Sequence, residues 1–344
     1  MDDCLFRQSF LIDSLYGDST ESATSFVAAN GTQFIRHFDG ILEVVPAAAK
    51  LAENPQHIII SCGVHGNETA PIELVNGIVT DLESGKLEVA HRCLFIIANI
   101  EAIKQNQRFI DENMNRLFDD VPRDSTKELV LADNLKIIVQ GFWKGTPEDA
   151  RWHLDLHCAI RASKHYTFAI SPKSRYPVRD KQLFDLMEAA QLEAVVLSNA
   201  PSCTFSWYTA ASFQAKALTV ELGKVARLGQ NDLTKLAPFD GALRTFIAGQ
   251  SLGEPEHKAD IYRVSRTITR INEDFAFLFD DDVANFTSFV HGEVFGHDGD
   301  KPLMAKNDDE AILFPNTKVG VGERAALMVC KVAARYEQDQ LVYD

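Results

Sequence analysis

Two short apolar runs, residues 58–62 and 92–99, enclose a segment with helical periodicity, and this pattern constrains the fold more than any other. Apolar runs of this length are typical of strands buried on both faces of a parallel sheet. Between them, residues 72–83 repeat apolar side chains at helical spacing, and Pro71 stands where proline is favoured at a helix start. A strand, a helix and a second strand in succession predict a βαβ unit.

The turn between the first run and the helix carries an imidazole and a carboxylate, His65 and Glu68. Sites in open α/β sheets lie on loops at the carboxyl ends of strands, where this turn is expected. Gly63 and Gly66 leave the turn free to fold tightly, so both side chains can converge on one metal ion. Taken alone, the spacing also fits a loop histidine followed by a helix-capping glutamate.

A later strand-like run, residues 152–161, carries three polar side chains that alternate with apolar ones. By the two-residue period of a strand, His153, Asp155 and His157 lie on one face. His157 is the candidate third metal ligand. Asp155 either orients a ligand imidazole or has a plain structural role. His153, like His165 further on, is expected to be structural.

The apolar run at residues 217–224 contains one carboxylate, Glu221, which must be paired or functional in such surroundings. His65, Glu68 and His157 together are the ligand set of a catalytic zinc that keeps its fourth position open for water. We expect one zinc ion per chain, with Glu221 as the general base.

Bulk properties predict a soluble globular enzyme and do not exclude an anionic small-molecule substrate. The 344 residues are 46% apolar and 24% charged, and the net charge of −15 argues against nucleic acid or an anionic membrane as a partner. Met1 to Cys4 shows no signal-peptide pattern, and the six cysteines are dispersed, so a cytoplasmic location is expected.

The composition changes near residues 249–259, which are rich in Gly, Glu, Pro and Lys. Short β-like runs separated by turn signals follow, over residues 261–271, 287–295, 311–314 and 325–332. We therefore expect a catalytic domain over residues 1–250 and a small all-β domain over residues 251–344 that covers the site.

Three motifs together resemble the zinc carboxypeptidase superfamily, and more narrowly its succinylglutamate desuccinylase and aspartoacylase branch. They are His-Gly-Asn-Glu-Thr-Ala-Pro, Asp-Leu-His-Cys-Ala-Ile-Arg and Val-Glu-Leu-Gly-Lys, and the similarity extends over nearly the whole chain. The resemblance implies an α/β fold with a carboxypeptidase-like mixed sheet flanked by helices. It also implies zinc-dependent hydrolysis of N-succinyl-L-glutamate to succinate and L-glutamate, the last step of arginine catabolism by succinyl transfer.

The same resemblance assigns roles to residues of a long polar stretch, residues 105–118. Asn115 and Arg116 match the superfamily's pair for a substrate carboxylate, and Arg108 matches its carbonyl-polarising arginine. Because the implied substrate has three carboxylates, Arg161 and Lys224 are further candidates for binding it. The alternative for each of these two residues is that it forms a surface ion pair and does not bind the substrate.

Three other functions stay open at this point. The first is hydrolysis of another N-acyl amino acid, such as an acylaspartate. The second is a non-catalytic zinc protein, which Glu221 disfavours because a structural zinc site needs no base. The third is a carboxypeptidase, which a covering β domain would hinder.

Overall fold

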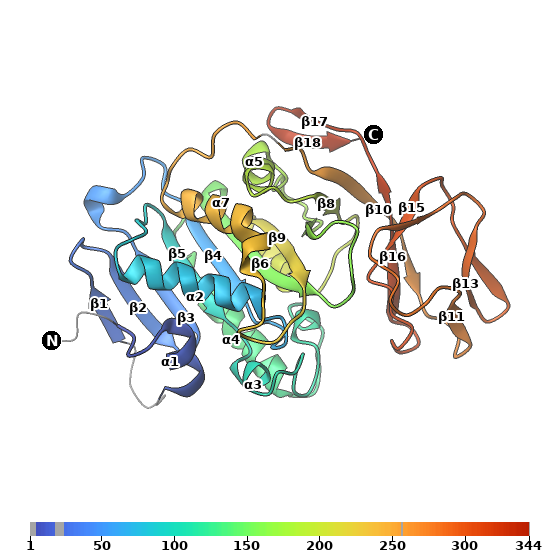
Figure 1. Cartoon of the computed structure of the whole chain (residues 1–344), viewed down its shortest axis with the longest axis horizontal. Coiled ribbons are helices and arrows are strands. Elements are labelled where there is room, and N and C mark those ends of the chain that lie inside the picture. The colour runs from blue at the N-terminus through green and yellow to red at the C-terminus, as the bar shows by residue number, and fades with distance from the viewer. Residues whose placement is uncertain (1–4, 18–23, 256, 344) are drawn as a thin grey trace.

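The computed structural model describes residues 5–17, 24–255 and 257–343, so the expectation about Met1 to Cys4 lies outside it. Within these ranges thirteen strands form one mixed sheet in the order β1-β2-β3-β5-β4-β6-β9-β7-β8-β10-β16-β15-β12 (Figure 1). The α/β architecture with a flanked mixed sheet and a C-terminal β part confirms the expected fold class.

The strands of the first 250 residues are β1 Thr24–Val27, β2 Gln33–Phe38, β3 Ile41–Val45, β4 His57–Cys62, β5 Arg92–Ile97, β6 Arg151–Ala159, β7 Thr167–Ser171, β8 Ala194–Leu197 and β9 Lys216–Lys224. The later strands are β10 Asp260–Thr269, β11 Phe275–Phe277, β12 Thr287–Phe289, β13 Val294–Asp298, β14 Lys301–Met304, β15 Glu310–Leu313, β16 Arg324–Lys331, β17 Ala334–Glu337 and β18 Gln340–Tyr343.

The α-helices are α1 Phe10–Tyr16, α2 Ala70–Glu83, α3 Ile100–Lys104, α4 Lys127–Phe142, α5 Lys181–Ala189, α6 Phe205–Phe213 and α7 Ala237–Ile247. The short 3-10 helices are η1 Ala48–Lys50, η2 Met114–Arg116, η3 Glu148–Ala150 and η4 Leu233–Leu236. None of the helices in the described residues is both long and apolar enough to cross a membrane.

The centre of the sheet is parallel. Strand β4 lies between β5 and β6 and runs parallel to both, and β6 runs parallel to β9. Neighbouring parallel strands end at the same edge of a sheet. The residues that follow β4 and those that end β6 and β9 are therefore brought together there.

Helices cover both faces of this centre. Ile58 and Ile60 point to one face, where they join a core with α1, α2, α5 and α7. Ile59 points to the other face, toward α4 and α6. All three isoleucines are fully buried, which explains the continuous apolar run in the sequence.

The turn from β4 to α2 requires glycine at two positions. Gly63 has φ +67°, a conformation that side chains other than glycine rarely adopt. A Cβ on Gly66 would lie 2.3 Å from the backbone carbon of Ala102, so only glycine lets α3 approach this closely. The tight turn expected from these glycines is confirmed.

The large sheet continues into the C-terminal part. Strand β10 pairs in parallel with β8 on one side and antiparallel with β16 on the other. All the regular elements among the described residues after α7 are strands, as expected. The hairpin β17–β18 nevertheless folds back over α5, where Lys181 N donates to Asp339 O at 2.7 Å. A domain boundary at residue 250 stays a proposal.

Several element predictions need correction. Residues 287–295, predicted as one strand, form β12 and the start of β13, separated by a turn in which Gly292 has φ +81°. The sequence also predicts one helix over residues 181–194, but α5 ends at Ala189, because Gln191 adopts φ +52° before β8 begins. Helix α6 and the hairpin β17–β18 were not predicted, since neither has a strong apolar period.

The long polar stretch at residues 105–118 is ordered by one buried carboxylate, Glu128 in the first turn of α4. Its Oε1 accepts from Ile110 N at 2.6 Å and from Asn99 Nδ2 at 3.0 Å. Its Oε2 accepts from the backbone N of Asp111 at 3.0 Å and of Glu112 at 3.3 Å. Burial would raise the pKa of Glu128, but these donors outweigh it and hold the pKa below its ordinary value.

We predict that Glu128→Gln lowers the free energy of unfolding by about 2 kcal/mol, because one carboxylate oxygen becomes an NH2 group that faces backbone N–H donors. Chemical denaturation measures this loss, and limited proteolysis within residues 105–118 reports the loosened loop. The matched control is Glu101→Gln, since Glu101 is an exposed partner of Lys127 at 2.8 Å. It should cost less than about 0.5 kcal/mol. Equal effects of the two changes would contradict the role given to Glu128.

Candidate metal centre

Three side chains from two neighbouring strand ends form one buried cluster. His65 and Glu68 come from the turn after β4, and His157 lies near the end of β6. Glu68 Oε1 is 2.9 Å from His65 Nδ1, and Glu68 Oε2 is 2.8 Å from His157 Nδ1. One donor atom from each of the three residues lies within 4.8 Å of the others, so the set can hold a metal ion.

Both imidazoles are oriented by an oxygen on their far side. His65 Nε2 lies 2.8 Å from Asn113 Oδ1, and His157 Nε2 lies 3.0 Å from Asp155 Oδ2. These acceptors favour a ring proton on Nε2, so the Nδ1 atom of each histidine, which faces Glu68, is the nitrogen available to a metal ion. An outer oxygen that fixes the tautomer is the arrangement usual for histidines that bind metals.

The cluster fits a metal ion on an independent observation. His65 Nδ1 is buried and makes no hydrogen bond, although it lies 2.9 Å from Glu68 Oε1. Buried polar atoms are normally satisfied, so an orphaned ring nitrogen at this point calls for a further group. A cation shared with Glu68 and His157 would satisfy it, and two imidazoles with one carboxylate suit zinc.

The charges of the cluster depend on one another. Burial would raise the pKa of Glu68, but the neighbouring imidazoles of His65 and His157 hold it well below its ordinary value. Burial lowers the pKa of His65. His157 has a raised pKa despite its burial, because the carboxylates of Asp155 and Glu68 both face it. Glu68 is thus an ionised carboxylate, the form that binds a metal.

Glu221 lies on β9 directly opposite His157 in the parallel register. Its Oε2 is buried without a hydrogen-bond partner. Burial, together with the negative charge of Glu68, raises the pKa of Glu221 to about 7. A buried, unpaired carboxyl group whose pKa is near neutrality is what a general base requires.

Arg108 reaches the same centre from the loop after α3. Its Nη1 donates to Glu68 Oε1 at 2.5 Å, and its guanidinium is half-buried. The structure thus places Arg108 beside Glu68, one of the candidate metal ligands.

Asn115 and Arg116 are adjacent but differ in their surroundings. Asn115 is buried, and its Oδ1 accepts from Phe205 N at 2.9 Å, while its Nδ2 lies 3.4 Å from His157 Nε2. Arg116 is exposed, and its Nη1 donates to the backbone oxygen of Asn115 at 2.8 Å. The structure thus brings Asn115 against the cluster and leaves the guanidinium of Arg116 open to a ligand.

The two remaining candidates differ. Arg161, which follows β6, has a buried Nη1 with no hydrogen-bond partner. Lys224 ends β9 with an exposed side chain and is the register partner of Ala159. The buried, unsatisfied guanidinium nitrogen of Arg161 favours a role in binding the substrate. The exposed side chain of Lys224 gives no evidence for such a role.

His153 and His165 occupy positions away from the ligand set. His153 is fully buried, contacts Ser61 Oγ and Thr209 Oγ1 at 2.9 Å each, and has its pKa lowered by burial to about 4. His165 lies 3.0 Å from Tyr262 Oη, against the C-terminal part. These contacts agree with the expectation that both histidines have structural roles and do not bind the metal.

Sequence reasoning missed three residues that support the site. Asn113 orients His65, Ser61 donates to Asp155 Oδ1 at 2.6 Å, and Glu128 holds the loop that carries Arg108. Two of the three could have been noticed in the sequence: Ser61 is a polar residue in the otherwise apolar run of β4, and Glu128 is a glutamate on the inner side of α4.

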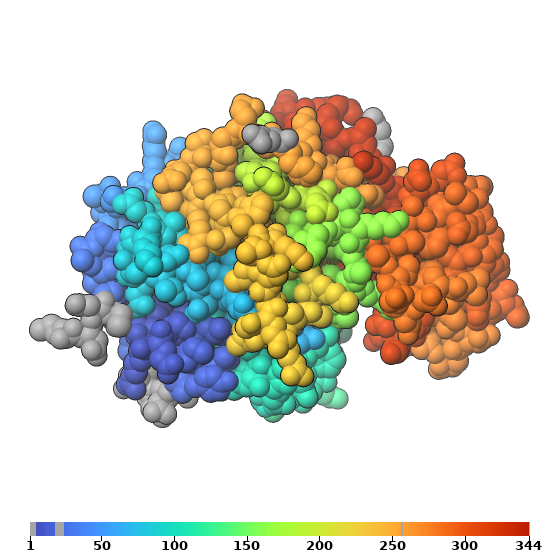
Figure 2. Space-filling model, viewed as in Figure 1, coloured from blue at the N-terminus to red at the C-terminus, as the bar shows by residue number. Residues whose placement is uncertain are grey.

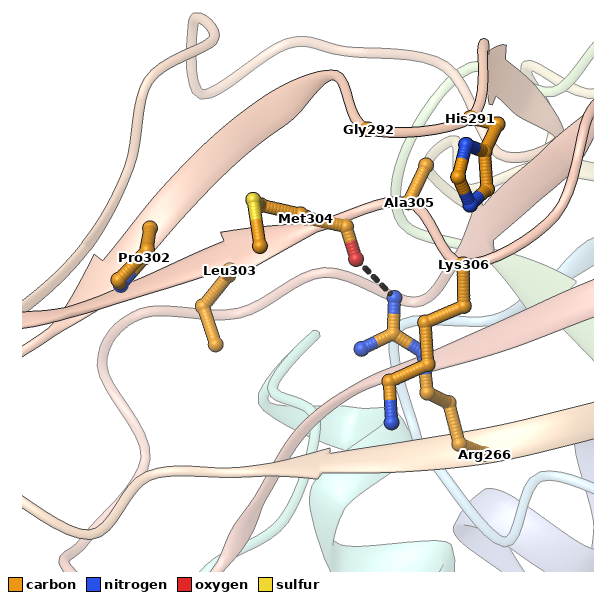
Figure 3. A pocket seen from close by; sticks show the side chains of 8 residues that line it. All are labelled: Arg266, His291, Gly292, Pro302, Leu303, Met304, Ala305 and Lys306. Atoms are coloured by element: carbon orange, nitrogen blue, oxygen red, sulfur yellow. Dashed lines mark hydrogen bonds between the residues drawn. The ribbon is translucent and has the colours of Figure 1, made fainter.

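The hollow shown in Figure 3 is not this site. It lies within the C-terminal part, and none of the candidate site residues lines it. Its lining residues are Arg266, His291, Gly292, Pro302, Leu303, Met304, Ala305 and Lys306. The guanidinium of Arg266 is already bound to Met304 O at 2.6 Å and to Glu310 at 2.8 Å.

The fold and the site define a hydrolase with a buried His-Glu-His cluster at the carboxyl edge of a mixed sheet. The profile of the succinylglutamate desuccinylase/aspartoacylase catalytic domain matches residues 54–247. The profile of the AstE/AspA barrel-sandwich hybrid domain matches residues 257–332. The chain belongs to the succinylglutamate desuccinylase/aspartoacylase family.

Close relatives match over the full length. The succinylglutamate desuccinylase of Vibrio campbellii is 58% identical over 341 residues, which cover 99% of each chain. The crystal structure of the enzyme of that name from Vibrio cholerae superposes with a TM-score of 0.96 at 56% identity, covering 99% of both chains. The one from Chromobacterium violaceum gives a TM-score of 0.81 at 33% identity, covering 94% of this chain and 97% of the other.

We predict that Asn113→Ala weakens metal binding about 10- to 100-fold, because His65 loses the oxygen that fixes its tautomer. Competition with a chromogenic chelator measures the affinity, and Asn113→Asp should retain most of it. Gln107→Ala, an exposed position on the same loop, is the control and should bind metal as the unchanged protein does. If Asn113→Ala binds metal equally well, Asn113 does not orient the ligand.

Proposed function

We propose that the protein is a zinc-dependent amidohydrolase that cleaves N-succinyl-L-glutamate to succinate and L-glutamate. The observation that carries the proposal is the unpaired carboxyl group of Glu221 beside a buried His-Glu-His cluster, in a chain of this family. Relatives that match nearly the whole chain bear the name succinylglutamate desuccinylase, which supports this choice of substrate.

His65, Glu68 and His157 would hold the zinc ion. When bound, zinc supplies a Lewis acid that acidifies water and polarises a carbonyl group. The proposal assigns one ion to each chain. Among the described residues, His65, Glu68 and His157 form the one group of three or more His, Cys, Asp or Glu side chains whose geometry could hold a metal ion.

Glu221 carries the proton transfers of the reaction. Hydrolysis adds a water oxygen to the succinyl carbonyl carbon and breaks the bond from that carbon to the glutamate nitrogen. Glu221 accepts one proton as water attacks and donates it to the departing amine. The second proton of the water leaves the new carboxyl group of succinate, and the amine takes up one proton to become ammonium, so that no net proton is consumed. A carboxyl group with a pKa of about 7 can serve in both directions near neutral pH.

The arginines bind and polarise the substrate. Arg108, at the edge of the cluster, donates to the carbonyl oxygen as negative charge develops on it. Asn115 and Arg116 hold one substrate carboxylate, a task that suits the two-pronged guanidinium. Arg161 is proposed for another carboxylate on the basis of its unsatisfied Nη1, and Lys224 is retained as a weaker candidate.

A cytoplasmic location belongs to the same proposal. Cys62, Cys93, Cys158, Cys203 and Cys330 are all free thiols, as expected in a reducing compartment. The proposal also keeps residues 251–344 as a domain that limits access to the site.

We predict that N-succinyl-L-glutamate is hydrolysed far faster than N-acetyl-L-aspartate or N-acetyl-L-glutamate by the zinc-loaded protein. The reason is that the acetyl compounds lack the succinyl carboxylate that the additional cations would bind. Release of primary amine from the three compounds measures the preference. Faster turnover of an acetyl compound would replace the proposed substrate but keep the reaction class.

We predict that Glu221→Gln lowers kcat by roughly two orders of magnitude or more while the zinc content stays normal, because the amide has the same shape but accepts no proton. Metal analysis, circular dichroism and turnover of N-succinyl-L-glutamate separate the two effects. Loss of zinc in the variant would make Glu221 a ligand, and retained turnover would place the base elsewhere. Glu88→Gln, at an exposed carboxylate that pairs with Lys50 at 2.7 Å on the surface, serves as the control.

A further inference from the structure

A buried polar network extends from the candidate metal centre to helix α6. Asp155, whose Oδ2 lies 3.0 Å from His157 Nε2, accepts with its other oxygen from Ser61 Oγ at 2.6 Å. Ser61 Oγ in turn lies 2.9 Å from His153 Nε2, and His153 Nδ1 lies 2.9 Å from Thr209 Oγ1. Ser61, His153 and Thr209, called here the Ser61–His153–Thr209 network, thus join Asp155 to α6 without a gap.

This network is closed off from solvent. Ser61, His153, Asp155 and Thr209 are all fully buried. They lie on the face of the sheet that α6 covers, and Figure 2 shows α2 in cyan and α7 in orange closing over the opposite face. Buried polar atoms are costly to leave unpaired, so each contact of the network is expected to hold one proton.

The protons of the network can be counted. Each hydroxyl has one proton, a neutral imidazole has one donor and one acceptor nitrogen, and a carboxylate only accepts. Ser61 gives its proton to Asp155, so the proton between Ser61 and His153 comes from His153 Nε2. His153 Nδ1 is then the acceptor, and it takes the proton of Thr209.

The competing arrangement leaves one contact without a proton. Thr209 Oγ1 also lies 2.9 Å from Ser206 O. If Thr209 donated there, His153 would carry its proton on Nδ1, and nothing would lie between its bare Nε2 and Ser61 Oγ. A second ring proton does not repair this contact near neutral pH, because burial lowers the pKa of His153 to about 4.

The imidazole of His153 is also fixed in direction. The ring of Phe205, the first residue of α6, packs edge-on against it with the ring centroids 4.5 Å apart. With the ring held in place, the tautomer decides whether Ser61 donates to Asp155 or to His153. Consecutive hydrogen bonds of one direction also strengthen one another in surroundings without water.

We propose that His153 is a positioning residue for the metal ligand His157, and that it acts through Ser61 and Asp155 with its proton on Nε2. All donors of the network then point toward Asp155, which is held by Ser61 on one oxygen and holds the His157 ring with the other. The inference rests on the proposed function, in which His157 binds zinc, and gives His153 a task beyond filling the core.

NMR of the ring nitrogens in isotope-labelled protein tests the tautomer directly, because protonated and bare nitrogens resonate far apart. The His153 signal is identified by its absence from His153→Gln and its shift in Thr209→Val. We expect the proton on Nε2 and a bare Nδ1. A proton on Nδ1, alone or together with one on Nε2, would overturn the proposal.

The second readout is zinc affinity, measured by competition with a chromogenic chelator. Ser61→Ala should weaken zinc binding about 10- to 100-fold, because Asp155 loses the donor that orients it toward His157. Thr209→Val keeps the shape of the side chain but removes its hydroxyl, and it should weaken binding by a smaller factor. Thr209→Ser, which retains the hydroxyl, should restore the affinity.

The matched control is Ser206→Ala, which removes another buried hydroxyl of α6. Ser206 Oγ lies 2.6 Å from Thr219 Oγ1 and takes no part in the network. The change should lower the stability of the protein to denaturant but leave zinc affinity unchanged, whereas Thr209→Val should lower both.

Unchanged zinc affinity in Ser61→Ala, or equal affinities in Thr209→Val and Ser206→Ala, would reduce the network to core packing and overturn the proposal. An unchanged protein that binds no zinc would instead overturn the proposed function. The two failures are distinguishable, because the tautomer of His153 is measured without reference to zinc.

Discussion

The contacts of Glu68 are the interaction on which the site depends. This buried carboxylate lies 2.9 Å from one imidazole, 2.8 Å from the other and 2.5 Å from Arg108, and it accepts from Cys158 N at 3.1 Å. An ionised carboxylate removed from water costs several kcal/mol unless such partners surround it. Because the partners come from three separate segments, Glu68 is stable only when the turn after β4, the end of β6 and the Arg108 loop are all in place.

The strand order supplies this arrangement. Strands β4, β6 and β9 are direct neighbours and parallel, so their carboxyl ends present the ligands and the base side by side. The register sets Glu221 directly opposite His157, close to the carboxylate of Glu68. Burial and the negative charge of Glu68 together raise the pKa of Glu221. The same geometry that assembles the metal ligands therefore also creates the group suited to accept a proton.

The C-terminal part is tied to the catalytic part by backbone as well as by side chains. Strand β10 extends the large sheet from β8 to β16. Near the end of β6, Asn285 N donates to Ala162 O at 2.8 Å, and Lys164 N donates to Asn285 O at 3.1 Å. The C-terminal strands are thus joined to the catalytic part by hydrogen-bonded backbone at two places.

The sequence by itself determined the elements and the chemistry that depend on local patterns. The apolar runs around residues 58–62 and 92–99, the glycines at 63 and 66, and the period of residues 152–161 identified β4, β5, the turn and β6, together with His65, Glu68, His157 and Glu221. Only the tertiary structure revealed Asn113 and Glu128. Asn113 meets a histidine 48 residues away, and Glu128 binds a backbone group 18 residues away. Periodicity records which face of an element is buried, whereas the partner of a lone polar side chain depends on strand order and loop path, which no local pattern contains.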